Sequence, residues 1–291
     1  MPELPEVEIT RRRIAPLLVG RRIASVRTTA PSYFYLTPPA TLRRRLPGRS
    51  VRSVERRGKY LIASLDDGQR LLVHLGMTGQ LFAENASSVR LLSSAARASL
   101  PPEAQGEFSP DEHTHLQLGF TDEGPGVMLR DVRKFGKVRL LAPGDREPRL
   151  EKLGLDALEV DAEHLFAASR KRRVAIKSLL LDQSVLAGVG NIYADEALFL
   201  AGVRPSRRAL RVTRAECTRM ARSLRQVLTR SIETGGSSIS DYVGPDGRDG
   251  RYQDERKVYA RTGEPCLVCG AKIVRRTIGQ RGTHYCTRCQ S

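Results

Sequence analysis

The sequence predicts an α+β protein of about two domains, in which an N-terminal helix and an antiparallel β domain precede a helical region and a C-terminal metal-binding hairpin. Three observations predict this organisation. The residue periodicity changes from strand-like to helical near residue 143, four of the five cysteines lie between residues 266 and 289, and the chain has 291 residues. An apolar fraction of 40% is enough to bury hydrophobic cores.

Residues 1–20 are expected to form a helix. Apolar side chains recur at helical spacing and give one broad face: Val7, Ile9, Ile14, Leu17 and Leu18. Gly20 is a typical stop signal. The chain begins MPELPEVE, with three glutamates in a protein of net charge +17. Proline in a first turn loses no hydrogen bond, and early carboxylates suit the positive end of the helix dipole. By itself, the octet therefore indicates an ordinary helix start.

Residues 21–142 are expected to form an antiparallel β domain, either a sandwich or a barrel. Short runs alternate apolar and polar residues, as in KYLIASLDDGQRLLVHLGM, and DDG and DEGPG stand between such runs as hairpin turns. The Ala-, Ser- and Pro-rich stretch 85–112 is predicted to be a flexible surface insertion, and PGDREP at 143–148 a linker. The first domain therefore covers 1–142.

Helical periodicity begins after the linker. Four segments are expected to form helices: EVDAEHLFAAS, AIKSLLLDQ, NIYADEALFLAG and TRAECTRMARSLRQVLTRSIETG. GGSS and GPDGRDG then indicate a mobile loop before the cysteines. The predicted domains are a helical domain over 149–243 and a C-terminal segment over 244–291, with the cysteine hairpin at about 257–291.

Four cysteines have the spacing of a zinc site: Cys266, Cys269, Cys286 and Cys289. Each C-x2-C pair can reach one ion from a tight turn, and the residues between the pairs can form a hairpin. Disulfides are rare in a reducing compartment, so we expect one tetrahedral zinc ion with four thiolate ligands. Such a site has no open coordination position, so the zinc is predicted to be structural. Cys217 is expected to be a packed small residue and not a nucleophile.

The charge balance predicts a polyanionic partner. Lysine and arginine outnumber aspartate and glutamate 49 to 32. Nucleic acid is the usual partner of so basic a protein, and a membrane surface is the alternative. No stretch approaches the ~20 uninterrupted apolar residues of a membrane span, and the acidic N-terminus lacks the layout of a signal peptide. We therefore expect a soluble, intracellular protein that is cytoplasmic and associated with the nucleoid through DNA binding.

A glycine turn, Gly188–Asn191, stands immediately before a predicted helix. Such a turn presents backbone N–H groups at a positive helix end, which suits a phosphate, although an ordinary helix connection with Asn191 as N-cap is the alternative. The preceding segment SRKRRVAIK carries five cations: Arg170, Lys171, Arg172, Arg173 and Lys177. Because this run adjoins the turn in a basic protein, contact with the DNA backbone is favoured over a solvated face.

Taken together, these segments resemble the formamidopyrimidine-DNA glycosylase branch of the Fpg/Nei base-excision repair family. The resemblance is carried by PELPEVE, RRGKYL, HLGMTG, DVRKFG, GVGNIYADE and the final C-x2-C…QRGTHYC-x2-C. The sibling endonuclease VIII branch typically begins PEGPE, so Leu4 favours the formamidopyrimidine branch. The stretch 85–112 is longer than the family requires. The resemblance implies a β-sandwich domain and a helix-two-turn-helix DNA-binding domain.

The resemblance further implies a bifunctional DNA glycosylase and abasic-site lyase that acts on 8-oxoguanine and formamidopyrimidines. Removal of the initiator methionine would expose the secondary amine of Pro2 as the nucleophile that forms a Schiff base at C1′. An α-amino group titrates near pH ~8, so a useful fraction is neutral. Glu3 would be the acid/base beside it, and Glu6 a supporting carboxylate. Lys59 would assist β-elimination, and Arg281 would contact phosphates and aid δ-elimination.

The same resemblance implies a DNA-binding surface. The expected contact residues are Met77, His113, Arg133, Phe135, Arg172, Lys177 and Asn191. Met77 and Arg133 would replace the extruded nucleotide, Phe135 would wedge into the stack, and GGSSISDYVG would fold over the extruded purine. The expected partner is double-stranded DNA with oxidised bases or abasic sites, bound by a monomer. Two alternatives stay open: an endonuclease VIII-like glycosylase for oxidised pyrimidines, and a non-catalytic zinc-containing binder of damaged DNA.

Overall fold

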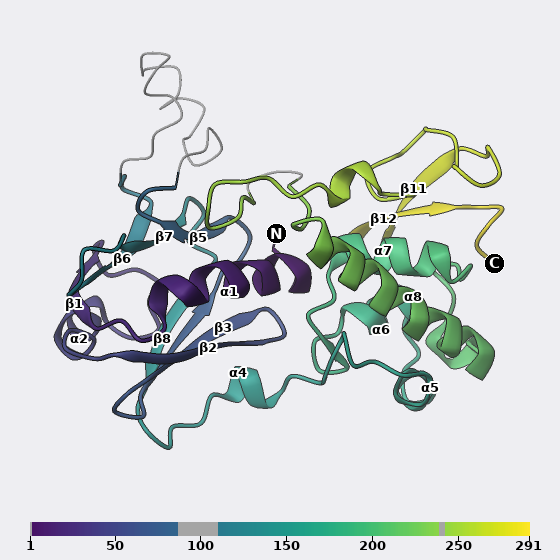
Figure 1. Cartoon of the computed structure of the whole chain (residues 1–291). Coiled ribbons are helices and arrows are strands. Elements are labelled where there is room, and N and C mark those ends of the chain that lie inside the picture. The colour runs from purple at the N-terminus through teal and green to yellow at the C-terminus, as the bar shows by residue number, and fades with distance from the viewer. Residues whose placement is uncertain (1, 87–109, 239–241) are drawn as a thin grey trace, which may run out of the picture. The chain divides into compact units, whose positions relative to one another are not determined.

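The computed structural model describes residues 2–86, 110–238 and 242–291 (Figure 1). The described chain forms two compact units. The first consists of Met1–Glu147 and Thr234–Arg251, and the second of Pro148–Glu233 and Tyr252–Ser291. Most of the predicted insertion over 85–112 lies outside the described residues, so its flexibility stays a prediction.

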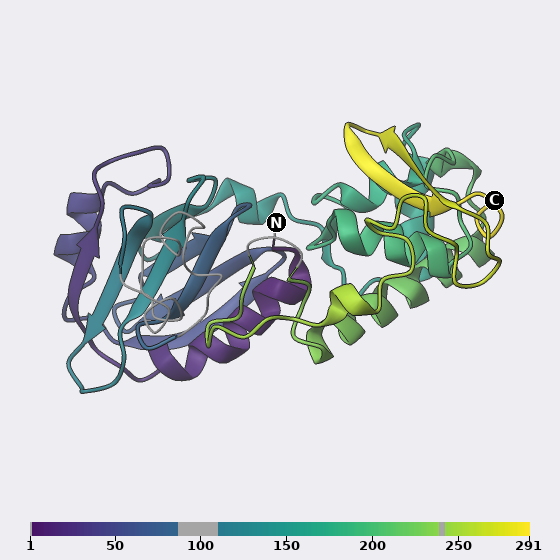
Figure 2. The same ribbon diagram turned by 90° about the horizontal axis from the view of Figure 1, so that it is seen from above.

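The described residues of the first unit form two four-stranded antiparallel sheets. Their strands are β1 (Ile23–Thr28), β2 (Val51–Arg57), β3 (Tyr60–Leu65), β4 (Arg70–His74), β5 (Gly79–Ala83), β6 (Thr114–Phe120), β7 (Val127–Asp131) and β8 (Lys137–Leu141). One sheet has the order β1–β6–β7–β5 and the other β2–β3–β4–β8. Figure 2 shows the two sheets from above, and apolar side chains from both sheets form one core. This arrangement confirms the sandwich that the family resemblance implies.

The strand turns follow the sequence pattern. The DDG turn joins β3 to β4, where Gly68 has a φ of +82° and the Leu65 N–H donates to the carbonyl of Gln69 at 2.8 Å. Glycine adopts this left-handed conformation without a steric penalty. The DEGPG segment joins β6 to β7, which pair antiparallel. Both predicted hairpin turns are therefore confirmed.

Among the described residues of the sandwich unit, two segments are helical, α1 (Leu4–Leu18) and α2 (Pro39–Arg45). α1 is the predicted N-terminal helix, and it packs against β2 and β5, which are edge strands of the two sheets. Val7, Ile14 and Leu18 carry its apolar face into the core. α2 was not predicted, because its sequence PATLRRR is short and shows no apolar stripe.

The second unit is helical and ends in a zinc-type hairpin. Its helices are α4 (Pro148–Glu151), α5 (Ala162–Arg170), α6 (Ile176–Leu181), α7 (Asn191–Leu200) and α8 (Arg214–Glu233), with 3-10 turns η2 (Ala209–Arg211) and η3 (Tyr252–Asp254). The hairpin pairs β11 (Ile273–Ile278) with β12 (Arg281–Cys286), and β9 (Leu155–Asp156) pairs with β10 (Leu186–Ala187). The four predicted helices correspond to α5 to α8. No helix in the described parts of the chain is long and apolar enough to cross a membrane.

The segment Thr234–Arg251 packs with the sandwich unit, whereas the predicted boundaries divided it between the helical and C-terminal domains. Gly235 and Gly236, with φ of +84° and +87°, stand directly after α8. The chain then returns to the first unit, where Arg13 of α1 pairs with Asp246 at 2.7 Å. The difference arises because contacts distant in sequence decide where a loop packs.

Candidate active site

The start of α1 brings together Pro2, Glu3 and Glu6. All three are buried, Glu3 and Glu6 with only 2% and 1% of their surface exposed. Oε2 of Glu6 accepts a hydrogen bond from the Glu3 N–H at 2.8 Å, and Oε1 accepts one from the Ser237 N–H at 2.9 Å. The Tyr242 hydroxyl donates to the Glu6 carbonyl oxygen at 3.2 Å. The Glu6 carboxylate therefore fixes both the backbone that follows Pro2 and the segment at Ser237.

Lys59 lies in the turn between β2 and β3 and is 9% exposed. The preceding Gly58 has a φ of +57°, which glycine adopts readily. Arg56 holds this turn, because its guanidinium donates to the Gly58 carbonyl at 3.1 Å and to Oε2 of Glu8 in α1 at 3.1 Å. The turn that carries Lys59 is thereby fastened to the helix that follows Pro2.

The contact between Arg56 and Glu8 is an ion pair. Burial by itself would raise the pKa of Glu8, but hydrogen bonds from Arg11 and Arg12 and the charge of Arg56 lower it to about 2. Glu8 is therefore ionised at neutral pH, and its ion pair with Arg56 persists there.

Met77, Arg133 and Phe135 lie on two neighbouring loops of the sandwich. Met77 is in the β4–β5 loop, and the other two are in the β7–β8 loop. Met77 and Phe135 are 36% and 44% exposed, although both are large and apolar. The loops touch, since a Cβ added to Gly76 would lie 2.4 Å from the backbone nitrogen of Gly136. Three residues that are predicted to contact DNA therefore lie on two adjacent loops at the surface of the sandwich unit.

Asp131 fixes the shape of these two loops. Its carboxylate accepts hydrogen bonds from the Thr78 hydroxyl, from the Arg133 N–H at 3.2 Å and from the Gly136 N–H at 2.7 Å. The Arg133 guanidinium carbon lies 4.7 Å from the centre of the Phe135 ring. The side chains are thus presented by a loop that is already organised.

His113 lies directly before β6, beside the same loop. Its carbonyl accepts a hydrogen bond from the Asp131 N–H at 2.9 Å, and its side chain is half-buried. Nε2 lies 3.7 Å from the Glu112 carboxylate, and Nδ1 has no hydrogen-bond partner among the described residues. The predicted contact role of His113 is compatible with this position and stays a prediction.

Arg281 opens β12 at the tip of the second unit's hairpin, and it is exposed. The turn before it consists of Gly279 and Gln280, with φ of +55° and +62°. Two consecutive left-handed residues are typical of the tight turns that match the twist of a hairpin. The turn therefore holds Arg281 at a defined, solvent-facing point.

Asn191 is the first residue of α7, and Gly190 takes the N-cap position. Nδ2 of Asn191 donates to the Gly282 carbonyl of β12 at 3.0 Å. Within the described residues, Oδ1 of Asn191 has no hydrogen-bond partner. Asn191 is therefore not the N-cap of the ordinary helix connection, and its side chain ties α7 to the hairpin.

The structure contradicts the predicted phosphate contact of Lys177. Lys177 is fully buried, and its ammonium lies 2.7 Å from Oδ1 of Asp195, which is also fully buried. The ammonium also donates to the Gly282 carbonyl at 3.0 Å and to the Thr283 hydroxyl at 2.9 Å. The other Asp195 oxygen accepts the His284 N–H at 2.8 Å. Lys177 thus joins α6, α7 and β12 inside the unit and is not available to DNA.

Lys177→Ala should lower the free energy of unfolding by roughly 3–5 kcal/mol, because it leaves the Asp195 carboxylate buried without its cation. Lys171→Ala, an exposed cation of the same run, is the matched control and should change stability by less than about 0.5 kcal/mol. Urea unfolding of both variants measures the difference. If both variants lost the same small amount of unfolding free energy, the buried Lys177–Asp195 pair would not contribute to stability.

Arg172 remains on the surface of the second unit. Its guanidinium pairs with Asp182 at 2.7 Å, and 41% of its side chain is exposed. Burial alone would raise the pKa of Asp182, but hydrogen bonds from Ser184 and the charge of Arg172 keep it below the usual range. Arg172 can exchange this partner for a phosphate, so its predicted DNA contact stands as a prediction.

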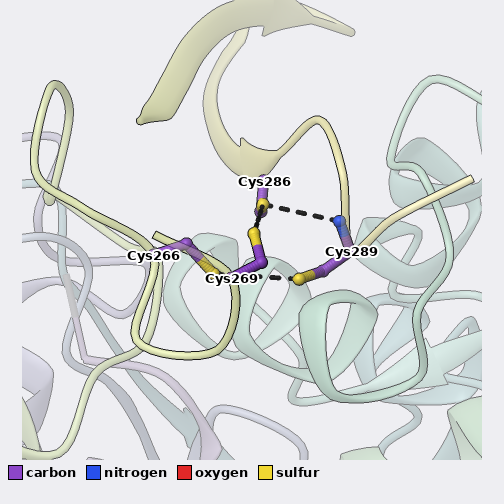
Figure 3. A group of neighbouring side chains, drawn as sticks. All are labelled: Cys266, Cys269, Cys286 and Cys289. Atoms are coloured by element: carbon purple, nitrogen blue, oxygen red, sulfur yellow. Dashed lines mark hydrogen bonds between the residues drawn. The ribbon is translucent and has the colours of Figure 1, made fainter. Parts of the chain in front are cut away.

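The four C-terminal cysteines converge on one point (Figure 3). Their Sγ atoms all lie within 4.8 Å of one another, with 3.8 Å between Cys266 and Cys289 and 3.4 Å between Cys269 and Cys286. A tetrahedral ion with Zn–S bonds of about 2.3 Å separates its sulfurs by about 3.8 Å. The residues present therefore fit one structural zinc ion, which the cysteine spacing predicts.

Family models match most of the chain. Residues 1–138 match the formamidopyrimidine-DNA glycosylase N-terminal domain, residues 153–243 the formamidopyrimidine-DNA glycosylase H2TH domain, and residues 263–291 the zinc finger found in FPG and IleRS. The formamidopyrimidine-DNA glycosylase of Cupriavidus pinatubonensis is 44% identical over 306 residues and covers 100% of both chains. The chain belongs to the formamidopyrimidine-DNA glycosylase family.

Solved structures of formamidopyrimidine-DNA glycosylases agree. A variant of the Lactococcus lactis FPG in complex with Fapy-dG containing DNA is 33% identical, covers 100% of both chains and has a TM-score of 0.85. MutM in complex with DNA that contains carbocyclic 8-oxo-G is 34% identical, with the same coverage and a TM-score of 0.84. The predicted resemblance and the predicted fold class are confirmed.

Cys217 of this formamidopyrimidine-DNA glycosylase family member is fully buried in α8. Burial raises the pKa of its thiol to about 11, so the reactive thiolate is scarce at neutral pH. The prediction that Cys217 is a packed residue is therefore confirmed.

Sequence reasoning missed several residues that hold the family's site in this chain: Glu8, Arg56, Asp131, Asp195 and Tyr242. A signal existed for two of them. Glu8 stands three and four residues before arginines on one helix, and Asp131 opens the DVRKFG motif. No local signal connects Asp195 with Lys177, because their contact depends on how α6 packs against α7.

Proposed function

We propose that Pro2 is the nucleophile with which this chain removes oxidised purines from double-stranded DNA and then cleaves the abasic site by β,δ-elimination. The observation that carries this proposal is the buried group of Pro2, Glu3 and Glu6 at the start of α1. Base displacement needs a nucleophile and a proton donor side by side, and a chain-terminal secondary amine next to a buried carboxyl group supplies both.

The chemistry starts when loss of the initiator methionine frees the Pro2 nitrogen. The lone pair of the neutral nitrogen forms a bond to C1′ of the damaged nucleotide, the glycosidic C–N bond breaks, and the departing base takes a proton. The Pro2 nitrogen then loses its own N–H proton, which restores a lone pair on it. The C1′–O4′ bond then opens, O4′ is protonated, and a cationic iminium forms between Pro2 and C1′. The iminium acidifies a C2′ hydrogen, and its loss expels the 3′ phosphate. The conjugated iminium that results acidifies the C4′ hydrogen, and its loss expels the 5′ phosphate. Glu3 is the acid/base for these transfers.

Glu6 positions this centre and does not react. Its two oxygens hold the backbone at Glu3 and at Ser237, at 2.8 Å and 2.9 Å. Lys59 assists proton transfer and phosphate contact during β-elimination. Arg56 links the turn that carries Lys59 to α1, because it contacts both Gly58 and Glu8. Both supports act by restricting geometry, which is a large component of catalysis.

The exposed loops of the sandwich support nucleotide extrusion. Extruding a base from the stack costs a few kcal/mol, and apolar side chains that fill the vacated space offset part of this cost. Met77 and Phe135 are large apolar side chains in solvent, and Arg133 lies over the Phe135 ring. We assign Met77 and Arg133 to the vacated space and Phe135 to the wedge.

The second unit supplies phosphate contacts. Exposed Arg281 on the hairpin, half-exposed Arg172 and Asn191 at the start of α7 are the residues that we assign to this role. Arg281 also aids δ-elimination by stabilising the departing phosphate. The four cysteines would hold one structural zinc ion, which would support the hairpin that presents Arg281.

The partner is duplex DNA with an oxidised base or an abasic site, and one chain acts alone. A net charge of +17 favours non-specific association with any duplex, so we expect the protein to be bound to chromosomal DNA. We therefore infer a cytoplasmic location with nucleoid association.

Borohydride trapping on a panel of duplexes tests the substrate class. 8-Oxoguanine and formamidopyrimidine duplexes should give covalent adducts at least about tenfold faster than thymine glycol or 5-hydroxycytosine duplexes. An undamaged duplex, the control, should give none. Faster trapping on the oxidised pyrimidines would favour an endonuclease VIII-like specificity. Specific binding without any adduct would favour a non-catalytic binder of damage.

A further inference from the structure

Tyr33 is an exposed aromatic residue that contacts the loop of residues 132–136, which we name the Arg133 loop. Its surface is 60% exposed. Its hydroxyl donates a hydrogen bond to the Arg133 carbonyl oxygen at 2.9 Å, and the Lys137 ammonium lies 4.9 Å from the centre of its ring. A tyrosine this exposed adds little to the hydrophobic core. The main interactions of the Tyr33 side chain are therefore those with the Arg133 loop and with Lys137.

The backbone around Tyr33 is fixed to the start of β8. The Val138 N–H donates to the Phe34 carbonyl at 3.1 Å, and the Leu36 N–H donates to the Val138 carbonyl at 2.8 Å. The Phe34 ring is fully buried, and it lies so close to Gly136 that a Cβ there would be 3.1 Å from it. Phe34 thus packs beneath the end of the Arg133 loop, and Tyr33 stands beside the loop at the surface.

Other contacts also hold the Arg133 loop, and one of them lies at its centre, where the Lys134 N–H donates to the Asp131 carbonyl at 3.2 Å. The Asp131 carboxylate accepts the N–H groups of Arg133 and Gly136, and the Lys137 ammonium donates to the Gly136 carbonyl at 2.9 Å. The Tyr33 hydroxyl adds a bond to the carbonyl of Arg133 itself. Beyond that carbonyl the chain enters Lys134 with a φ of +57°, which is uncommon for a residue other than glycine. The Tyr33 bond therefore holds the carbonyl side of the peptide between Arg133 and Lys134, whose N–H side is held by the Asp131 carbonyl.

We propose that Tyr33 is a positioning residue that holds Arg133 in the conformation with which it fills the space left by an extruded nucleotide. The proposal rests on the role assigned to Arg133 above. The hydroxyl orients the Arg133 carbonyl, and this sets the direction of the guanidinium over the Phe135 ring. Because the arrangement exists before DNA binds, it spares the complex the entropy cost of ordering the loop.

The test is a double-mutant cycle with Tyr33→Phe and Arg133→Ala. Binding is measured to a duplex with a tetrahydrofuran analogue of an abasic site and to the same duplex without it. Tyr33→Phe keeps the ring and removes one hydrogen bond, so it should weaken binding to the analogue duplex roughly threefold to tenfold. Binding to the intact duplex should not change. In the Arg133→Ala background, Tyr33→Phe should have no further effect.

Two results would overturn the proposal while leaving the role of Arg133 in place. Tyr33→Phe could bind like the wild type while Tyr33→Ala binds weakly, which would assign the effect to the ring. Alternatively, the effects of Tyr33→Phe and Arg133→Ala could add, which would make them independent. If Arg133→Ala itself binds the analogue duplex like the wild type, the role assigned to Arg133 fails as well. Thermal unfolding of Tyr33→Phe should match the wild type, so that misfolding does not imitate the effect.

Discussion

A chain with an acylated N-terminus should form no borohydride-trapped adduct with abasic-site DNA, although it still binds the duplex. Acylation removes the basic lone pair of the Pro2 nitrogen, and an iminium cannot form without it. Pro2→Gly keeps a terminal amine but loses the ring that restricts its direction. Small displacements of a reacting group can cost about 100-fold in rate, and we expect a loss of that order. Trapping rates and binding to a tetrahydrofuran duplex provide the two measurements.

Pro5→Gly is the matched control for this result. Pro5 is buried like Pro2, but it lies in the first turn of α1 and its nitrogen is inside the chain. Its replacement should leave trapping within a few-fold of the wild type, because it removes no terminal amine. Wild-type trapping by the acylated chain would rule out Pro2 and turn attention to Lys59.

Glu3→Gln should slow the release of 8-oxoguanine by roughly 10²–10⁴-fold, because it removes the proton donor and leaves the hydrogen-bonding shape. Incision of a preformed abasic site should suffer less, since no base has to depart. The dependence of DNA affinity on salt should stay the same, because the substitution removes no cation. Single-turnover excision, abasic-site incision and a salt titration of binding measure the three quantities.

Glu123→Gln serves as the control for Glu3→Gln, since Glu123 is exposed and lies in the DEGPG turn between β6 and β7. It should leave excision near the wild-type rate. An equal loss of base release and abasic-site incision in Glu3→Gln would contradict a role in base departure. It would place Glu3 at the iminium steps alone.

The periodic parts of the fold could be predicted from sequence. Strand alternation between residues 21 and 142 and the glycine-containing DDG turn correspond to β3 and β4 with Gly68 between them. The cysteine spacing likewise predicts the thiolate cluster. In these cases the information is local, because a turn type or a C-x2-C knuckle is set by a few neighbouring residues.

Lys177 shows where local reasoning fails. It stands in a cationic run that looks like a surface, yet it lies on the buried side of α6 with Leu180. Its partner Asp195 comes from α7, so nothing within the run distinguishes Lys177 from exposed Lys171. A buried lysine is recognised only when the packing that supplies its counter-charge is known.

The proposed catalytic centre was predictable from sequence only in part. Pro2, Glu3 and Glu6 were predicted from the family resemblance of a short motif. The contacts that position them were not predicted, because Tyr242 and Ser237 reach Glu6 across more than two hundred residues of sequence. The position of Thr234–Arg251 within the first unit follows from such contacts and from no local pattern.

The identity of the residue that becomes covalently bound to DNA distinguishes Pro2 from every other amine of the chain. The borohydride-reduced complex with abasic-site DNA is digested with nuclease and trypsin, and the modified peptide is sequenced by mass spectrometry. We expect the sugar remnant on the nitrogen of Pro2, in the peptide that ends at Arg11. Trypsin does not cleave after a modified lysine. A remnant on Lys59, in a peptide that continues past this residue, would show that Pro2 is not the nucleophile.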